Sequence, residues 1–187
     1  MMRPTRLLWV AVAPLLLSAA CSGSGDDGVG STGGTGHLTV ALTDTPIDID
    51  TVQNVFVTID SVEVFPADEG SSEPGKIELM PQAETFDLLT LTGGVTDVLA
   101  EEDLPAGFYT KIRLGVSQAS MVFKDQTVVD LKLDSRKVDV NVPFEVVASD
   151  PLIVTLDFDA AASLHIVETG SGKYILRPVV KAVSVDP

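Results

Sequence analysis

The chain has 187 residues, enough for one good-sized domain, and 45% apolar with 21% charged residues is a globular composition. Its formal net charge is −15, and such an acidic surface repels phosphate backbones and anionic lipid headgroups, which argues against a nucleic-acid-binding protein. Aromatic residues make up only 5%, whereas Val, Leu and Thr are plentiful, and this balance favours β structure.

The first 20 residues have the three parts of a secretory signal peptide. A basic start with Arg3 and Arg6 precedes the apolar run Leu7–Leu17, and small residues follow up to Ala20. As a helix the stretch from Leu7 to Ala20 would rise about 21 Å, short of the roughly 30 Å of hydrocarbon that a membrane span must cross. We therefore expect residues 1–20 to be an export signal.

Cys21 follows directly and is the only cysteine, so no intramolecular disulfide can form. The segment resembles a bacterial lipoprotein signal, in which this cysteine becomes the lipidated first residue, with acyl chains such as palmitate. Such signals carry Leu three places before the cysteine, whereas here Ser18 stands there and Leu17 one place earlier. An ordinary signal peptide with a chance cysteine is the alternative.

Ser22 after the cysteine implies, by the sorting rule usual for Gram-negative lipoproteins, an exported protein anchored in the outer membrane. Residues 21–36 then form a Gly/Ser-rich tether whose mean reach is about 20 Å. A chain that begins at Cys21 carries 10 basic against 27 acidic side chains, a net charge of −17.

Residues 37–187 show the pattern of a single β domain. Short runs alternate apolar and polar residues with period two and are separated by turn signals. The runs are His37–Thr43, Asn54–Phe65, Ile77–Met80, Thr110–Val116, Met121–Phe123, Thr127–Leu133, Lys137–Val142, Phe144–Val147, Leu152–Asp159 and Lys173–Val183. They predict an all-β antiparallel sandwich, immunoglobulin-like or prealbumin-like, of about seven to nine strands with one or two short helical turns.

Four segments break the regular alternation. The parity of the second run changes near Asp60–Ser61, which predicts a β-bulge. Thr85–Leu91 fits a strand end or a helical turn, and Val95–Ala100 predicts a short helix or turn. Asp159 is a candidate cap for a brief turn over Ala160–Leu164.

The segment Leu104–Tyr109 predicts a tight corner before a central strand, because Pro105 fixes φ and Gly107 permits a positive φ. Tyr109 has the outward parity of Lys111. Either the corner contains a bulge that turns the tyrosine inward, or its ring covers the corner, and the sequence leaves both alternatives open.

Six segments in a fixed order carry a family resemblance: LTVALTDTP (38–46), VFVTIDSVEV (55–64), TFDLLTL (85–91), LPAGFYTKIRL (104–114), LDFDAAASL (156–164) and GKYILRPVV (172–180). Over residues 38–183 the chain resembles the bacterial and archaeal family called domain of unknown function 4382. The resemblance implies an exported, lipoprotein-borne domain with no assigned activity. The corner is also similar to the Leu-Pro-x-Gly-x-Tyr corner of transthyretin-like sandwiches.

No catalytic residues are expected. The two histidines, His37 and His165, have no serine in a Gly-x-Ser-x-Gly setting, and too few His and Cys remain for a zinc site. Asp157 and Asp159 share a strand face about 7 Å apart, as in some glycosidases. The only tryptophan, Trp9, lies in the signal peptide, which argues against a glycosidase and against sugar binding by aromatic stacking.

Two polar sets remain as candidates. Arg113, Asp157, Arg177 and Lys181 have outward parity on strands that can be neighbours, which predicts a stripe of cross-strand ion pairs. Asp44, Asp48 and Asp50 offer oxygen ligands for calcium, although their spacing matches no EF-hand loop, and a solvated acidic loop is the alternative. No other cofactor is expected.

These observations predict a lipid-anchored envelope protein that is not an enzyme. The first hypothesis is a ligand-binding or adhesion module whose end loops, Asp44–Gln53 and Ala67–Lys76, recognise an envelope glycan or protein. The alternative is a structural scaffold that binds another protein by edge-strand pairing at Lys173–Val183.

Overall fold

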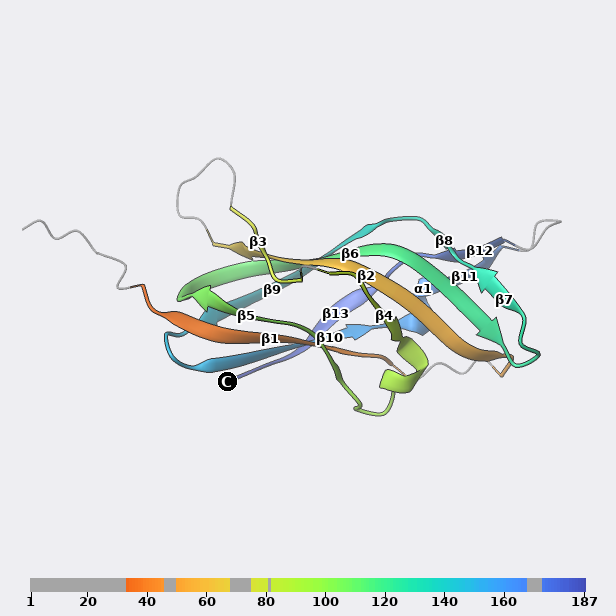
Figure 1. The fold of residues 1–187 in the computed structure, drawn as a ribbon, viewed down its shortest axis with the longest axis horizontal. Helices are drawn as coiled ribbons and strands as arrows, with labels where there is room; N and C mark the ends of the chain where they lie inside the picture. Colours follow the sequence, from red (N-terminus) through yellow and green to blue (C-terminus); the bar gives the residue numbers. More distant parts are fainter. Residues whose placement is uncertain (1–32, 46–49, 68–74, 81, 168–172) are drawn as a thin grey trace, which may run out of the picture. The chain divides into compact units, whose positions relative to one another are not determined.

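Strands account for almost all regular structure in the computed structural model, which describes residues 33–45, 50–67, 75–80, 82–167 and 173–187 (Figure 1). Within these residues the helical elements are the 3₁₀ turn η1 (Leu88–Leu91) and the single-turn helix α1 (Ala160–Ser163). The predicted all-β sandwich is confirmed.

Sheet A has the strand order β13–β10–β1–β5. Its strands are β1 (Thr35–Thr43), β5 (Asp97–Pro105), β10 (Pro151–Phe158) and β13 (Val180–Asp186). The pairs β1–β5 and β10–β13 are antiparallel, whereas the central pair β1–β10 is parallel. The prediction of a purely antiparallel sandwich is therefore wrong for this one pair of strands.

Sheet B is built on the long antiparallel pair β2 (Val52–Pro66) and β6 (Gly107–Phe123). The short strands β3 (Ile77–Glu78) and β4 (Glu84–Asp87) pair with β2, while β7 (Val128–Asp130) and β9 (Lys137–Val146) pair with β6. A small sheet C contains β8 (Lys132–Leu133), β12 (Lys173–Leu176) and β11 (Leu164–Val167).

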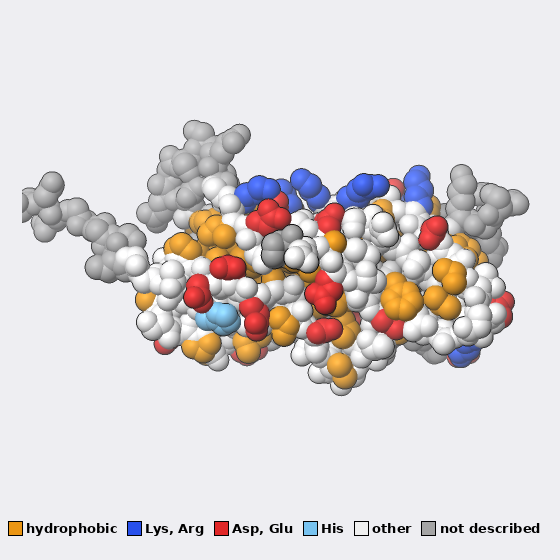
Figure 2. All heavy atoms as spheres, in the orientation of Figure 1, with side chains coloured by type: hydrophobic (Ala, Val, Ile, Leu, Met, Phe, Trp, Pro, Cys, Tyr) orange, Lys and Arg blue, Asp and Glu red, His pale blue; other side chains and the backbone are white. Residues whose placement is uncertain are grey.

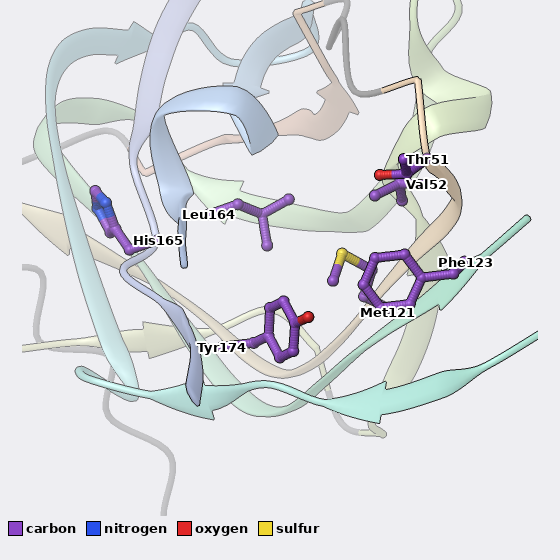
Figure 3. Close-up of a pocket in the computed structure, with 7 residues that line it drawn as sticks. All are labelled: Thr51, Val52, Met121, Phe123, Leu164, His165 and Tyr174. Atoms are coloured by element: carbon purple, nitrogen blue, oxygen red, sulfur yellow. The ribbon is translucent and has the colours of Figure 1, made fainter. Parts of the chain in front are cut away.

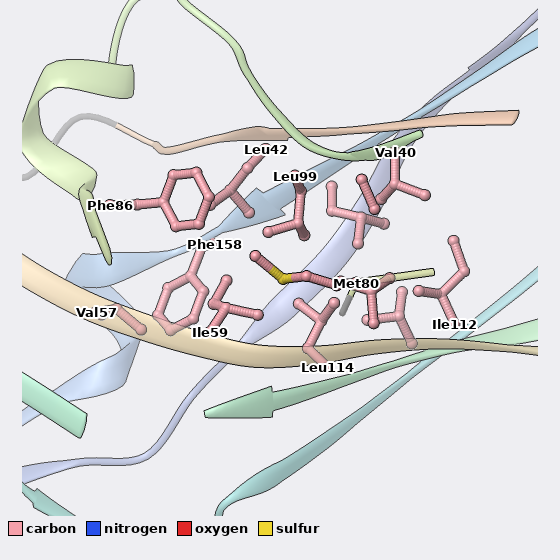
Figure 4. Close-up of a cluster of buried hydrophobic side chains, with 14 of the residues drawn as sticks. Val40, Leu42, Val57, Ile59, Met80, Phe86, Leu99, Ile112, Leu114 and Phe158 are labelled. Atoms are coloured by element: carbon pink, nitrogen blue, oxygen red, sulfur yellow. The ribbon is translucent and has the colours of Figure 1, made fainter. Parts of the chain in front are cut away.

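The core consists of the inward-facing residues of the alternating strands, which meet between the sheets (Figure 4). Leu42 of β1, Ile59 of β2, Leu114 of β6 and Phe158 of β10 are fully buried there. Full burial of such a side chain contributes roughly 1.5–3 kcal/mol. The period-two pattern therefore identified the core faces correctly.

Two local predictions are confirmed. The register of β2 on β6 shifts between Ile59 and Ser61, so Val55, Val57 and Ile59 before this bulge face the core together with Val62 and Val64 after it. Asp159 caps α1, because its side chain accepts a hydrogen bond from the backbone N–H of Ala162 at 2.8 Å.

The helix or turn predicted for Val95–Ala100 is wrong, because this segment leads into the edge strand β5. Gly93 and Gly94 form the turn with φ of 71° and 87°, after which Val98 pairs with Ala41 of β1. The backbone of β1 thus supplies hydrogen bonds that a short isolated helix would lack.

The single last strand predicted for Lys173–Val183 is divided into β12 and β13, which belong to different sheets. Pro178 lies in the break between them, where the missing N–H leaves no ladder hydrogen bond unmade. Of these two strands only β13 is an edge, since β12 lies between β11 and β8.

Of the two alternatives for the corner Leu104–Tyr109, the structure has the bulge. The register of β6 on β9 shifts between Tyr109 and Lys111, which turns the tyrosine inward, where it is 3% exposed. Its hydroxyl donates a hydrogen bond to the carbonyl of Pro105 at 2.9 Å, and its ring stacks on Phe144 with centroids 5.2 Å apart.

We expect Tyr109→Phe to lower the free energy of unfolding by about 1 kcal/mol, because it removes this hydrogen bond and keeps the stacked ring. Urea unfolding of the full chain measures the loss. Tyr174→Phe is the matched control, since the Tyr174 hydroxyl makes no hydrogen bond within the described residues. Equal losses in the two variants would contradict the assigned role of the corner.

Candidate functional site

A break in the pairing of β6 creates a hollow on the outer face of sheet B. Strand β9 pairs with β6 as far as Gly115, and β7 pairs with it from Ser120 onward. In between, the chain leaves sheet B to form β8, which pairs with β12 in sheet C. Two backbone hydrogen bonds bracket the gap, from Val116 to Arg136 at 2.8 Å and from Leu131 to Ala119 at 2.9 Å.

Three adjoining hollows follow from this break. The largest, about 610 Å³, shares Gln118 and Asp130 with a hollow of about 280 Å³ over β2 and β4. It shares Arg136 with a hollow of about 400 Å³ beside the bulge of β2. We call the three together the sheet-B groove and define it by Thr58, Thr85, Gln118, Ser120, Asp130 and Arg136.

The groove is polar and offers unused hydrogen-bonding groups. The hydroxyls of Thr58 and Thr85 bond each other at 2.8 Å. In contrast, the side chains of Gln118, Ser120 and Asp130 make no hydrogen bond with any described residue. A row of free amide, hydroxyl and carboxylate groups can bind a ligand that carries many hydroxyls.

Basic side chains gather along this face, at the upper edge of the view in Figure 2. Three of them are paired. Asp139 of β9 accepts from Lys111 at 3.2 Å and from Arg113 Nη2 at 2.9 Å, and Lys76 contacts Glu63. The hydrogen bond from Arg113 lowers the pKa of Asp139 to about 2.

The predicted ion-pair stripe is wrong in its central contact. Arg113 lies on β6 of sheet B, whereas Asp157 lies on β10 of sheet A, so the two cannot pair across neighbouring strands. Arg177 instead pairs with Asp134 at 3.0 Å, and Lys181 with Asp159 at 3.4 Å. Asp157, predicted to face outward, is buried as well. The parity of a residue along its strand does not tell which sheet that strand joins.

Two carboxylates are buried where the parallel strands β1 and β10 end. Asp44 is 3% exposed and accepts from the backbone N–H of Ala160 at 2.9 Å. Asp157 is 8% exposed and accepts from the Thr45 hydroxyl at 2.7 Å. The second oxygen of each, Asp44 Oδ2 and Asp157 Oδ1, is buried without a hydrogen-bond partner.

Burial raises the pKa of Asp44 to about 6, and the charges of Asp157 and Asp159 add to the rise. The N–H of Ala160 opposes it by stabilising the ionised form. Asp44 therefore exchanges its proton near pH 6 in the folded protein.

The structure does not bring together the three residues of the calcium hypothesis. Asp44 points inward to Ala160, Asp50 is exposed in the turn before β2, and Asp48 lies outside the described residues. Within the described part of the chain, no group of three or more His, Cys, Asp or Glu side chains is placed to hold a metal ion. Asp44 and Asp157 could supply two oxygens, fewer than the six to eight that calcium prefers.

A small apolar cavity lies between β2, β6 and sheet C (Figure 3). Its volume is about 30 Å³, enough for roughly one water and too small for an organic ligand. Phe123 and Tyr174 meet edge to face at its wall, with centroids 5.8 Å apart, and in Figure 3 the ring of His165 points away from them.

Other predicted sites fall outside the described residues. These are Cys21 and much of the two end loops, residues 46–49 and 68–74. None of the described helices is long and apolar enough to cross a membrane.

The sheet-B groove cannot be recognised from the sequence alone. Its residues are spread over several strands, and the only local hint was the basic segment that contains Lys132, Arg136 and Lys137.

Because folding raises the pKa of Asp44, the stability that this group contributes is complete below about pH 4 and is lost as the pH rises through 6. Asp44→Asn removes the charge and keeps the oxygen that accepts from Ala160. We expect it to raise the free energy of unfolding at pH 7.5 by about 2 kcal/mol relative to the wild type, with little difference at pH 4.

Urea unfolding at the two pH values measures this effect. Asp50→Asn is the control, since Asp50 is exposed and the substitution should change stability little at either pH. A stability difference between Asp44→Asn and the wild type that is the same at both pH values would contradict the prediction.

Among known proteins, the chain is similar to one family. The chain matches none of the curated proteins and none of the solved structures with which it was compared. Residues 35–178, which include sheet B and most of sheet A, match the family described as Domain of unknown function (DUF4382), and the chain belongs to this family.

Proposed function

We propose that this protein is a ligand-binding module of the bacterial cell envelope, exported, held at the outer membrane by a lipid on Cys21, and not an enzyme. The anchor is supported by residues 1–21, where a short apolar run and small residues precede the only cysteine. Residues 22–36 would allow the domain to stand about 20 Å from the membrane.

The observation that carries the binding function is the sheet-B groove. The long antiparallel pair β2–β6 forms its floor, and Gln118, Ser120 and Asp130 present polar groups with no partner among the described residues. An extended, hydroxyl-rich ligand such as a polysaccharide can exchange hydrogen bonds with this row of groups. The proposed binding surface is thus the outer face of sheet B, whereas the sequence pattern favoured the two end loops.

A second candidate is a structural scaffold that binds another protein by adding a strand to sheet A. The edge strand β13 favours it, because Val183 is 57% exposed there and the outer side of β13 has no strand neighbour in the described sheet. A protein partner bound at β13 would be unaffected by substitutions in the groove.

We expect wild-type protein in a Gram-negative host to fractionate with membranes and to be released only by detergent. Cys21→Ala should be found in the soluble envelope fraction, because no lipid can be attached. Ser22→Ala is the control and should remain membrane-bound. Recovery of Cys21→Ala in the membrane fraction would contradict the anchor.

The groove is tested by affinity electrophoresis of the full chain, purified in detergent, in gels that contain neutral or acidic polysaccharides. We expect retardation by at least one polysaccharide and its loss in Gln118→Tyr, whose ring fills the groove. Thr155→Tyr adds the same ring to the outer face of sheet A and should keep binding. Retardation by none of them, or equal retardation of both variants, would contradict a polysaccharide-binding groove.

A further inference from the structure

The basic side chains on and beside the outer face of sheet B fall into two sets. Lys76, Lys111 and Arg113 each have a carboxylate partner. Lys132, Arg136 and Lys137 form no ion pair with any described residue. The unpaired set is the one that lines the groove, so its positive charge is available to a ligand.

Arg136 occupies the central position of this set. It lines both the hollow of about 610 Å³ and the hollow of about 400 Å³, and Lys132 and Lys137 line one of them each. A guanidinium without a partner presents a planar fork that matches a carboxylate or sulfate. A ligand that runs along the groove would pass this fork.

The carboxylates of the groove do not cancel this charge. Asp60 lines the hollow of about 400 Å³, and Asp130 lines the hollow of about 610 Å³. Three cations without an ion pair thus face two carboxylates without one, because the third carboxylate, Glu63, is paired with Lys76 and Arg113. The chain from Cys21 onward carries −17 in total, yet salt screens charges beyond about 8 Å. The local excess of positive charge therefore governs what binds here.

The composition of the groove also argues for a charged ligand. Among the described residues, Phe56 is the only aromatic side chain that lines it, and the chain after the signal peptide has no tryptophan. Without a stacking platform, hydrogen bonds in water would add little net affinity for a neutral sugar. Charge-assisted hydrogen bonds are roughly twice as strong as neutral ones, and an acidic sugar would form them.

An acidic peptide fits less well, because a peptide would bind best by adding a strand. The gap in the pairing of β6 spans only Ser117 and Gln118, which is too short for a strand. We infer that the groove binds an acidic polysaccharide, with an acid group on Arg136 and sugar hydroxyls on Gln118 and Ser120. This inference rests on the proposed binding function of the same groove.

Polygalacturonate and its fully methyl-esterified form test the charge directly, because they share one backbone and differ only in the acid group. Isothermal titration of the full chain in detergent should show binding of the acid form and at least tenfold weaker binding of the ester. Arg136→Gln should weaken binding of the acid form about tenfold, and raising salt should weaken it further.

Lys124→Gln is the matched control and should leave binding unchanged, since Lys124 is exposed, lies outside the groove and forms no ion pair with any described residue. Equal binding of acid and ester that Gln118→Tyr abolishes would overturn the acidic ligand and keep the binding groove. Equal binding of a DNA duplex would mean unspecific attraction of polyanions and would overturn the inference. Binding of neither form would overturn the inference of an acidic ligand. The proposed binding function of the groove would be contradicted only if no neutral polysaccharide bound either.

Discussion

The register between β2 and β6 is the constraint on which both faces of sheet B depend. A bulge at Asp60–Ser61 lets the apolar residues on either side of it share the core face. Gly115 lies opposite this bulge, and a β-carbon there would collide with the side chains of Asp60 and Ser61. Since side chains alternate with period two, a slip by one residue would turn Glu63 and Arg113 into the core.

The same register separates the paired cations from the unpaired ones. Arg113 lies between Glu63 of β2 and Asp139 of β9, and its guanidinium sits 5.0 Å from the centroid of Phe65. Lys132 lies in β8, the segment that leaves sheet B, and Arg136 follows it, so no described carboxylate of a neighbouring strand lies opposite them. A structural ion-pair network thus adjoins a group of cations without a described partner, and the departure of β8 from sheet B separates the two.

At the end of the parallel pair β1–β10, the buried carboxylate of Asp44 fixes the chain in place but lowers the stability of the folded protein when it is ionised. Asp44 accepts the first N–H of α1 and so ties β1 to the crossover that follows β10. The side chain that accepts this hydrogen bond is a buried carboxylate close to Asp157, and no described residue forms an ion pair with it. The proton that Asp44 takes up near pH 6 relieves the cost, which links this end of the sandwich to pH.

Local pattern predicted the class and the faces of this fold. Alternation from Leu38 onward identified the strands and the core, the change of parity located the bulge, and the six family segments identified the DUF4382 domain. Turn chemistry identified Asp159 as a helix cap. These features depend on a few consecutive residues, which is why sequence alone could determine them.

Pairing between distant segments was decided only in the tertiary structure. Val95–Ala100 leads into a strand because β1 offers an unpaired edge, Arg113 meets Asp139 rather than Asp157, and Tyr109 turns inward at a bulge. The groove exists because β6 exchanges β9 for β7. The sequence by itself determined which face of its strand each residue occupies, whereas the three-dimensional fold decided its neighbours, because strand pairing is a long-range property that local periodicity does not encode.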